Sequence, residues 1–156
     1  MKKVKIYTDG ACSGNPGRGG FGVILEYNGR KKELSKGFRK TTNNRMELMA
    51  VITGLSALKE PCEVEVISDS KYVVDAIVKE WVYTWADHDW VKSDKKPVLN
   101  VDLWEELLLL IEGHVVSFTW VEGHAGHPEN ERCDALAVAA AKGSDLAIDE
   151  EYEENE

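Results

Sequence analysis

The sequence is 156 residues long, which suits one domain with a substantial core and is short for two. Apolar residues make up 43 % of it, but we expect neither a membrane span nor a secretory signal, because no apolar run is long enough. The net charge of −9 disfavours a nucleic-acid partner at first sight, yet residues 1–45 hold eleven Lys and Arg against three Asp and Glu. That asymmetry suits a protein that grips phosphates with one surface, although on charge alone solvated faces are the better explanation.

The first third of the chain predicts three strands. Alternating apolar and polar residues indicate a strand over 4–8 that ends at Asp9, and a glycine-rich turn follows. Strands over 21–27 and 31–40 come next, and Asn28-Gly29 between them is typical of a type I′ hairpin turn. These three strands are therefore expected to pair antiparallel.

Helices and strands alternate in the rest of the chain. We expect helices from Asn44, over 70–79, from Asn100 and over 128–143, strands over 63–68 and 115–121, and an irregular segment over 81–97. This order predicts an α/β protein with a mixed five-stranded sheet, three antiparallel strands then two parallel, flanked by helices. The last twelve residues hold seven acids and no base, so we expect a mobile tail with little to bury.

Four acids lie where α/β folds build their sites. Asp9 and Asp69 each end a strand, while Glu47 and Asp134 each lie near a helix start beside an apolar stripe. If the four converge, their mutual repulsion is severe unless cations lie between them. Oxygen-only ligation selects hard ions such as Mg²⁺ or Mn²⁺.

Each acid also has a structural explanation. Asp9 and Asp69 can be turn or cap residues, Glu47 can be the N3 partner of a capping box, and Asp134 can favour a helix dipole. Taken singly, these explanations are the stronger ones, since perturbed carboxylates are often structural. Four acids at consistent positions favour a shared site.

The three cysteines are odd in number, widely spaced and without a C-x-x-C pair: Cys12, Cys62 and Cys133. They argue against a disulfide framework and a thiolate zinc site, and they favour a reducing cytoplasm.

Several runs, in order between about Lys3 and Gly143, resemble bacterial ribonuclease HI, the type 1 ribonuclease H. They are Ile6–Gly10, Gly14–Gly17, Thr41–Leu48, Ser68–Ser70 and Trp120–Asp134. The runs Thr-Thr-Asn-Asn-Arg-Met-Glu and Gly-His-Ala-Gly-His within them are long and specific.

The resemblance implies a ribonuclease H fold over residues 1–144, with 145–156 as the tail, and cleavage of the RNA strand of RNA–DNA hybrids. It further implies two Mg²⁺ ions with substrate, Mn²⁺ being an alternative, and products with 5′-phosphate and 3′-hydroxyl ends. Asp9 would bridge both ions, Asp134 would serve the ion that activates water, and Glu47 and Asp69 would serve the leaving-group side. His124 would assist proton transfer or product release, although a loop histidine can also merely stack or cap.

The resemblance also implies a set of substrate-binding residues: Asn15, Asn43 and Asn44 at the minor groove and sugars, Thr42 and Arg45 at a phosphate, Lys71 as an addition, and Trp81 against the DNA sugars. For Trp104 and Trp120 we expect core packing instead. One departure stands out, because relatives carry a basic protrusion where this chain has Ala86-Asp87-His88-Asp89. The loss of positive charge in this protrusion should affect the affinity for the hybrid but not the chemistry of cleavage.

Two other classes compete. A DNA-directed nuclease of the same superfamily is disfavoured by the Thr-Thr-Asn-Asn-Arg run and by a chain with no room for further domains. A hybrid-binding module without activity is disfavoured because the four acids and His124 are all retained. A monomer is expected, since no strong additional apolar patch is visible.

Overall fold

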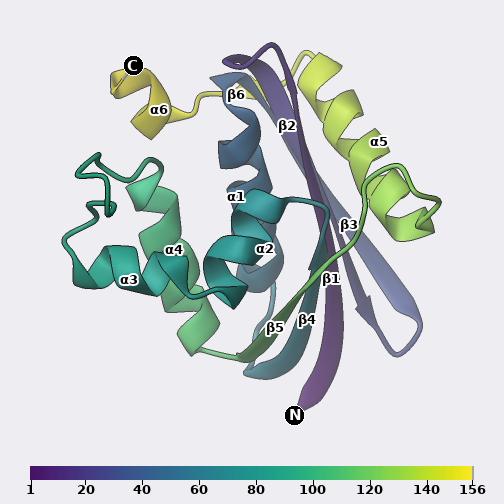
Figure 1. Ribbon diagram of the computed structural model, residues 1–156. Coiled ribbons are helices and arrows are strands. Elements are labelled where there is room, and N and C mark those ends of the chain that lie inside the picture. The colour runs from purple at the N-terminus through teal and green to yellow at the C-terminus, as the bar shows by residue number, and fades with distance from the viewer. Residues whose placement is uncertain (156) are drawn as a thin grey trace.

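A mixed sheet with helices on both faces makes up the computed structural model, which describes residues 1–155 (Figure 1). The strands are β1 Lys2–Ser13, β2 Gly17–Tyr27, β3 Arg30–Thr41, β4 Cys62–Ser68, β5 Val115–Trp120 and β6 Leu146–Ala147. The helices are α1 Asn43–Ser56, α2 Lys71–Val78, α3 Trp81–Asp87, α4 Val101–Glu112, α5 Pro128–Lys142 and α6 Glu150–Glu154. Within the described residues, none of the helices is long and apolar enough to cross a bilayer.

The sheet runs in the order β5-β4-β1-β2-β3-β6. The β1–β2 and β2–β3 pairs are antiparallel, and β4 pairs parallel with both β1 and β5, which confirms the predicted mixed topology. The hairpin turn is confirmed too, since Asn28 and Gly29 have φ of 50° and 76°, as a type I′ turn requires. The predicted strand count is one short, because the two-residue β6 pairs parallel with β3 at the sheet edge.

The acidic tail has more to bury than the sequence indicated. Residues Leu146–Ala147 add to the sheet, and Asp149 is 3 % exposed. Its carboxylate accepts hydrogen bonds from the Thr41 hydroxyl (2.7 Å) and from Arg45 Nε (2.7 Å). The expectation of a tail with little to bury is therefore wrong, because an acid with long-range partners can be buried.

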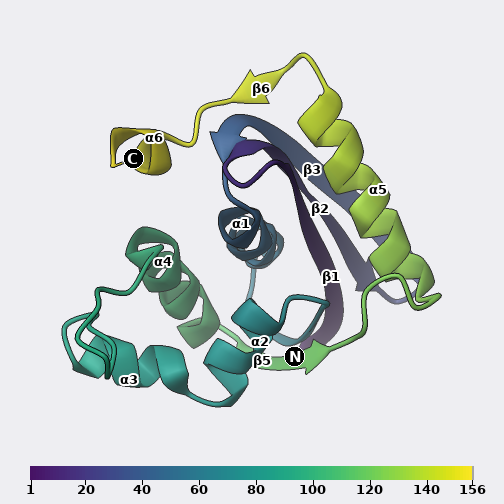
Figure 2. The same cartoon turned by 45° about the horizontal axis from the view of Figure 1, so that its top comes forward.

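Two layers of helices enclose the sheet. In Figure 2, α1, α2 and α4 lie on one side of it and α5 on the other. Trp104 of α4 is fully buried in the main core, as the sequence predicted. On the opposite face α5 lies directly on β2: a Cβ at Gly22 would stand 2.3 Å from the Cys133 carbonyl oxygen. This close packing of α5 on β2 fixes the position of Asp134, the next residue on α5, relative to the sheet.

The irregular segment expected over 81–97 is partly helical. Residues 81–87 form α3, whose Val82 is fully buried and whose Trp85 ring meets the Trp104 ring edge-on at 6.2 Å. Seven residues are too few to show a helical period in the sequence, so the contact with α4 was not visible there.

Candidate active site

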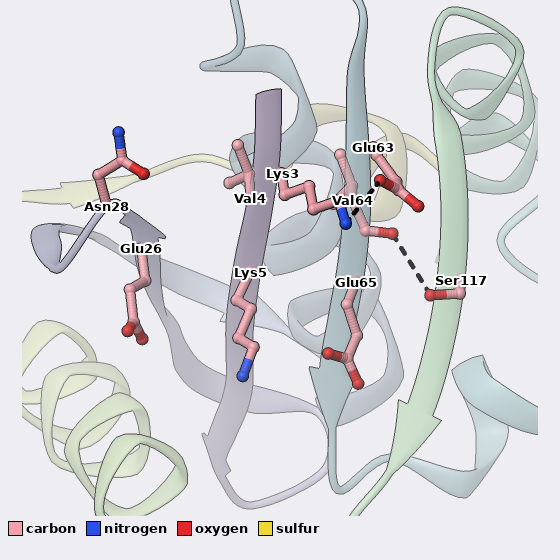
Figure 3. Close-up of a pocket in the computed structure, with 9 residues that line it drawn as sticks. All are labelled: Lys3, Val4, Lys5, Glu26, Asn28, Glu63, Val64, Glu65 and Ser117. Carbon is pink, nitrogen blue, oxygen red and sulfur yellow. Dashed lines mark hydrogen bonds and ion pairs between the residues drawn. The ribbon is translucent and has the colours of Figure 1, made fainter. Parts of the chain in front are cut away.

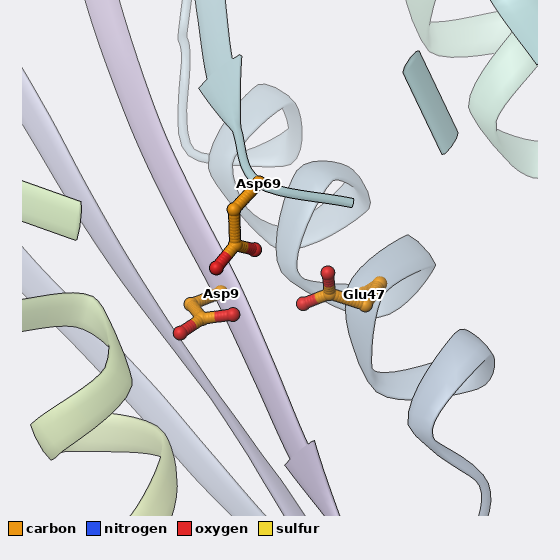
Figure 4. Close-up of side chains that lie close together, drawn as sticks. All are labelled: Asp9, Glu47 and Asp69. Atoms are coloured by element: carbon orange, nitrogen blue, oxygen red, sulfur yellow. The ribbon is translucent and has the colours of Figure 1, made fainter. Parts of the chain in front are cut away.

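Three of the predicted acids meet at one point of the sheet. Parallel pairing of β1 with β4 sets Thr8 opposite Ser68, so the next residues of the two segments, Asp9 and Asp69, lie side by side. Helix α1 brings Glu47 against them from the adjoining layer (Figure 4). The three residues each offer an oxygen within 4.8 Å of the others, and among residues 1–155 they form a group able to hold a metal ion.

The structural explanation for Glu47 does not hold. Helix α1 begins at Asn43, one residue before the expected Asn44, and is capped by Thr42, whose hydroxyl accepts a hydrogen bond from the Arg45 N–H (3.2 Å). Glu47 is then the fifth residue of the helix and is too far along to complete a capping box. Its Oε1 is buried and has no hydrogen-bond partner within the described part of the chain.

The electrostatics of the cluster call for a cation. Burial, followed by repulsion from neighbouring carboxylates, raises the pKa of both Asp9 and Glu47 above its ordinary value. For Asp9 the repulsion comes first from Glu47 and then from Asp69, and for Glu47 it comes from Asp69. Three converging acids with an orphaned, buried oxygen fit a hard divalent ion, which would satisfy that oxygen and cancel the repulsion.

An open pocket of about 370 Å³ extends from this cluster. Besides the three acids it is lined by Asp134 and His124, so all five predicted catalytic side chains face one space. Asp134 stands apart from the tight group of three. The remaining lining residues are Gly10, Asn43, Asn44, Ser70, Lys71 and Tyr72, of which Gly10, Ser70 and Tyr72 were not predicted as site residues. No spacing signal joins them, because Gly10 lies in β1 whereas Ser70 and Tyr72 lie at the start of α2.

The predicted substrate residues divide among three places. Asn43, Asn44 and Lys71 line the acidic pocket. Asn15, Thr42 and Arg45 line a neighbouring pocket of about 480 Å³, which Asn44 also borders and which α6 walls with Glu151 and Tyr152. Trp81, at the start of α3, is 45 % exposed and lines neither pocket.

Arg45 differs most from its expected role. Its side chain is buried, and its guanidinium is bound by Asp102 (2.9 and 2.7 Å), Asp149 (2.7 and 3.1 Å) and the Asn100 amide oxygen (3.3 Å). These contacts engage all five N–H groups that the guanidinium has. In this arrangement Arg45 shapes the wall of its pocket and has no N–H left for a phosphate.

A separate pocket lies on the part of the sheet that α5 leaves open (Figure 3). Its charges oppose one another, as in the pair of Lys3 and Glu63 (4.0 Å), and its Ser117 hydroxyl donates to the Val64 carbonyl (3.5 Å). Nothing there converges as the acids of the first pocket do.

The sheet topology, with carboxylates from β1, α1 and the end of β4 gathered at one point, defines a mixed α/β fold with an acidic cluster that could hold a divalent metal ion. The sequence profile named RNase H matches residues 1–142, and the chain belongs to the ribonuclease H family, a family of hydrolytic endoribonucleases. The chain is 61 % identical to the ribonuclease H of Desulforamulus reducens, over 96 % of this chain and 94 % of the relative. It is 56 % identical to that of Escherichia coli O9:H4, over 94 % of both.

Solved structures agree with this family assignment. LC9-RNase H1, described as a type 1 RNase H with the type 2 active-site motif, superposes with a TM-score of 0.82 at 36 % identity, over 99 % of this chain and 80 % of that one. LC11-RNase H1 in complex with an RNA/DNA hybrid superposes with a TM-score of 0.68 at 28 % identity, over 88 % and 96 %. The family and fold predicted from the sequence are thereby confirmed.

Proposed function

We propose that this chain is an endonuclease that hydrolyses the RNA strand of RNA–DNA hybrids by a two-metal-ion mechanism and leaves 5′-phosphate and 3′-hydroxyl ends. The observation that carries the proposal is the junction of Asp9, Glu47 and Asp69 in a pocket that Asp134 and His124 also line. The proposal includes a monomeric, cytoplasmic enzyme that uses Mg²⁺, with Mn²⁺ as an alternative.

The four acids would hold the ions. Asp9 offers an oxygen within 4.8 Å of those of Glu47 and Asp69 and would take the bridging role. Glu47 and Asp69 would serve the leaving-group side, and Asp134, which lines the same pocket, would serve the water side. When bound, a pair of such ions activates water and stabilises the entering and leaving oxygens of an in-line displacement. Water oxygen bonds to phosphorus, the bond from phosphorus to the 3′-oxygen breaks, and that oxygen takes up a proton.

The other pocket residues would position the hybrid. Asn43 and Asn44 are exposed at the start of α1 within the acidic pocket, and the Asn15 amide oxygen accepts from the Asn43 N–H (3.2 Å). These amides can donate to and accept from a 2′-hydroxyl, the group that distinguishes RNA from DNA. Thr42 and Lys71 supply a hydroxyl and a cation for phosphates, and the exposed Trp81 supplies a flat surface for deoxyriboses.

A cleavage assay on three substrates tests this function. The protein is incubated with hybrid, duplex DNA or duplex RNA of one sequence in Mg²⁺, and parallel reactions contain EDTA. Internal cuts in the RNA strand of the hybrid alone, abolished by EDTA, are expected. Cleavage of duplex DNA would indicate a DNA-directed nuclease instead, and hybrid binding without any cleavage would indicate a binding module.

Replacing His124 by Ala should lower kcat by no more than about 10²–10⁴-fold, the usual range of general acid–base assistance, with a smaller change in KM. His124 is exposed in the loop between β5 and α5, has a positive φ of 55° and lines the acidic pocket. Steady-state kinetics on the hybrid measures both constants. His127→Ala is the matched control, since His127 lies in the same loop and outside the pocket lining, and it should leave kcat unchanged. A rise in KM at constant kcat would make His124 a substrate contact.

Reversing the acidic charge of the protrusion should lower KM several-fold at low salt and leave kcat unchanged. Asp87 ends α3 and Asp89 follows it, and both are exposed. Asp89 has a φ of 55°, which Asn tolerates better than Lys, so the variant is Asp87→Lys with Asp89→Asn. Each new phosphate contact should steepen the dependence of log affinity on log salt by about 0.9. An unchanged KM and salt slope would show that the protrusion lies away from the hybrid.

A further inference from the structure

Trp120 does not pack in the core as the sequence predicted. It is the last residue of β5 and is 41 % exposed. Its indole N–H donates a hydrogen bond to the backbone carbonyl of Asp69 (3.0 Å). The strand pairing of β4 with β5 ends at Ser68 and Trp120, and the backbone hydrogen bond from the Val121 N–H to the Ser68 carbonyl (3.0 Å) lies at this end of it. The Trp120 side chain therefore holds the backbone of Asp69 at the point where the hydrogen bonds of the sheet end.

The backbone of the segment that follows Trp120 packs closely against the Asp69 side chain. A Cβ at Gly123 would stand 2.6 Å from Asp69 Oδ2, so only a residue without a side chain lets this backbone pass so close to the carboxylate. His124 comes next in the same loop and lines the pocket. Asp69 is thus held at its backbone by Trp120 and bounded at its carboxylate by Gly123.

The face of the same indole positions a second pocket residue. Lys71 Nζ lies 4.8 Å from the centre of the Trp120 ring, a cation–π distance, and Lys71 lines the acidic pocket beside Asp69. The edge of the ring and its face therefore act on two different pocket residues, a carboxylate proposed to bind metal and a cation proposed to bind phosphate.

We propose that Trp120 is a positioning residue of the active site: through its N–H it fixes the Asp69 carboxylate for the metal, and through its ring it presents Lys71 to the substrate. This inference rests on the proposed metal site. Outer-shell partners that orient a ligand typically account for about 10–100-fold in metal affinity or activity, and the Trp120 N–H belongs to this group of contacts.

The test removes the indole N–H of Trp120 and keeps an aromatic ring at this position. Trp120→Phe, and Trp120 replaced by 3-benzothienylalanine, which exchanges only the N–H for sulfur, are titrated with Mg²⁺ alone while the unfolding temperature is followed. The midpoint of the Mg²⁺ titration should rise about tenfold or more in both, and the unfolding temperature in EDTA should match the parent's. Trp90→Phe, a partly exposed tryptophan beyond α3, is the control and should keep the parent midpoint. If Trp120→Phe does not fold, the near-isosteric replacement decides alone.

A Mg²⁺ midpoint equal to the parent's in the benzothienyl protein would overturn the proposal. Hybrid kinetics then separate the two roles of the ring: Trp120→Leu, which also removes the cation–π contact, should raise KM by a further two- to fivefold, roughly the size of an exposed cation–π contact. Equal KM values for Trp120→Leu and Trp120→Phe would overturn the part that concerns Lys71. Because Mg²⁺ binding is measured without nucleic acid, a parent that binds Mg²⁺ but fails to cleave hybrid refutes the proposed function and leaves this inference standing.

Discussion

Replacing Asp9 by Asn is expected to abolish hybrid cleavage and to make the metal-free protein more stable. Asp9 is buried beside Glu47 and Asp69, and it is the proposed bridging ligand of both ions. Loss of a direct ligand should exceed the roughly hundredfold upper range seen for outer-shell partners. The gain in stability has a separate cause, since the neutral amide removes a carboxylate that burial and its acidic neighbours resist ionising.

The pH dependence of unfolding in EDTA gives the sign of that effect. Because the pKa of Asp9 is raised in the folded protein, its favourable contribution is complete below the ordinary aspartate pKa of about 4 and is lost as the pH rises through the raised value. At neutral pH the Asn variant should therefore unfold a few degrees above the parent, and part of the parent's loss of stability with rising pH should disappear. Thermal unfolding monitored by circular dichroism from pH 4 to pH 9 measures both.

Two variants serve as controls for Asp9→Asn. Asp145→Asn removes an exposed acid of the tail and should change neither activity nor stability. Asp134→Asn should be milder than Asp9→Asn, because Asp134 stands apart from the tight cluster and an amide oxygen can still ligate a metal. A parent-like circular dichroism spectrum together with retained Mg²⁺-dependent cleavage in Asp9→Asn would refute the assignment.

The parts of the fold that the sequence predicted correctly are those with local signals. Alternation placed the strands, and the Asn28-Gly29 pair placed the hairpin. Asp69 directly follows β4 as predicted, but the predicted strand end at Asp9 is wrong, because β1 continues past Asp9 to Ser13 through its pairing with β2. The convergence of these acids with Glu47 follows from strand order, which the alternation of strands and helices restricts to few arrangements.

The parts that the sequence did not predict depend on partners far away in the chain. Arg45 and Asp149 lie 104 positions apart, and Trp120 and Asp69 lie 51 apart, so no periodicity or motif joins them. Composition made the tail look like a solvated acidic segment, because it is blind to a single buried Asp149. Family resemblance marked Arg45 as a site residue, whereas the contacts that occupy its guanidinium are visible only in the structure.

Replacing Arg45 by Met should destabilise the protein by about 3–5 kcal/mol, the usual cost of removing one partner of a buried ion pair. The substitution leaves Asp149 fully buried and Asp102 partly buried without their shared cation, and it releases the contact that ties the tail to α1. Urea unfolding at pH 7 measures the change. Arg132→Met is the matched control, because its two-pronged contact with Glu33 (2.7 and 2.9 Å) is exposed and should have little measurable effect.

Acid unfolding distinguishes this ion-pair account of Arg45 from simple packing of its side chain. Burial is the largest single influence and would raise the pKa of Asp102, but the hydrogen bonds and the charge of Arg45, together with backbone hydrogen bonds, outweigh burial and hold that pKa below its ordinary value. The stabilising contribution of Asp102 is therefore complete above the ordinary aspartate pKa of about 4 and is lost as the pH falls through the lowered value. In Arg45→Met this part of the acid transition should vanish, since the carboxylate has lost the cation that favours its ionised form. A variant as stable as the parent at pH 7, or one with an unchanged acid transition, would mean that the buried guanidinium contributes by shape and not by charge.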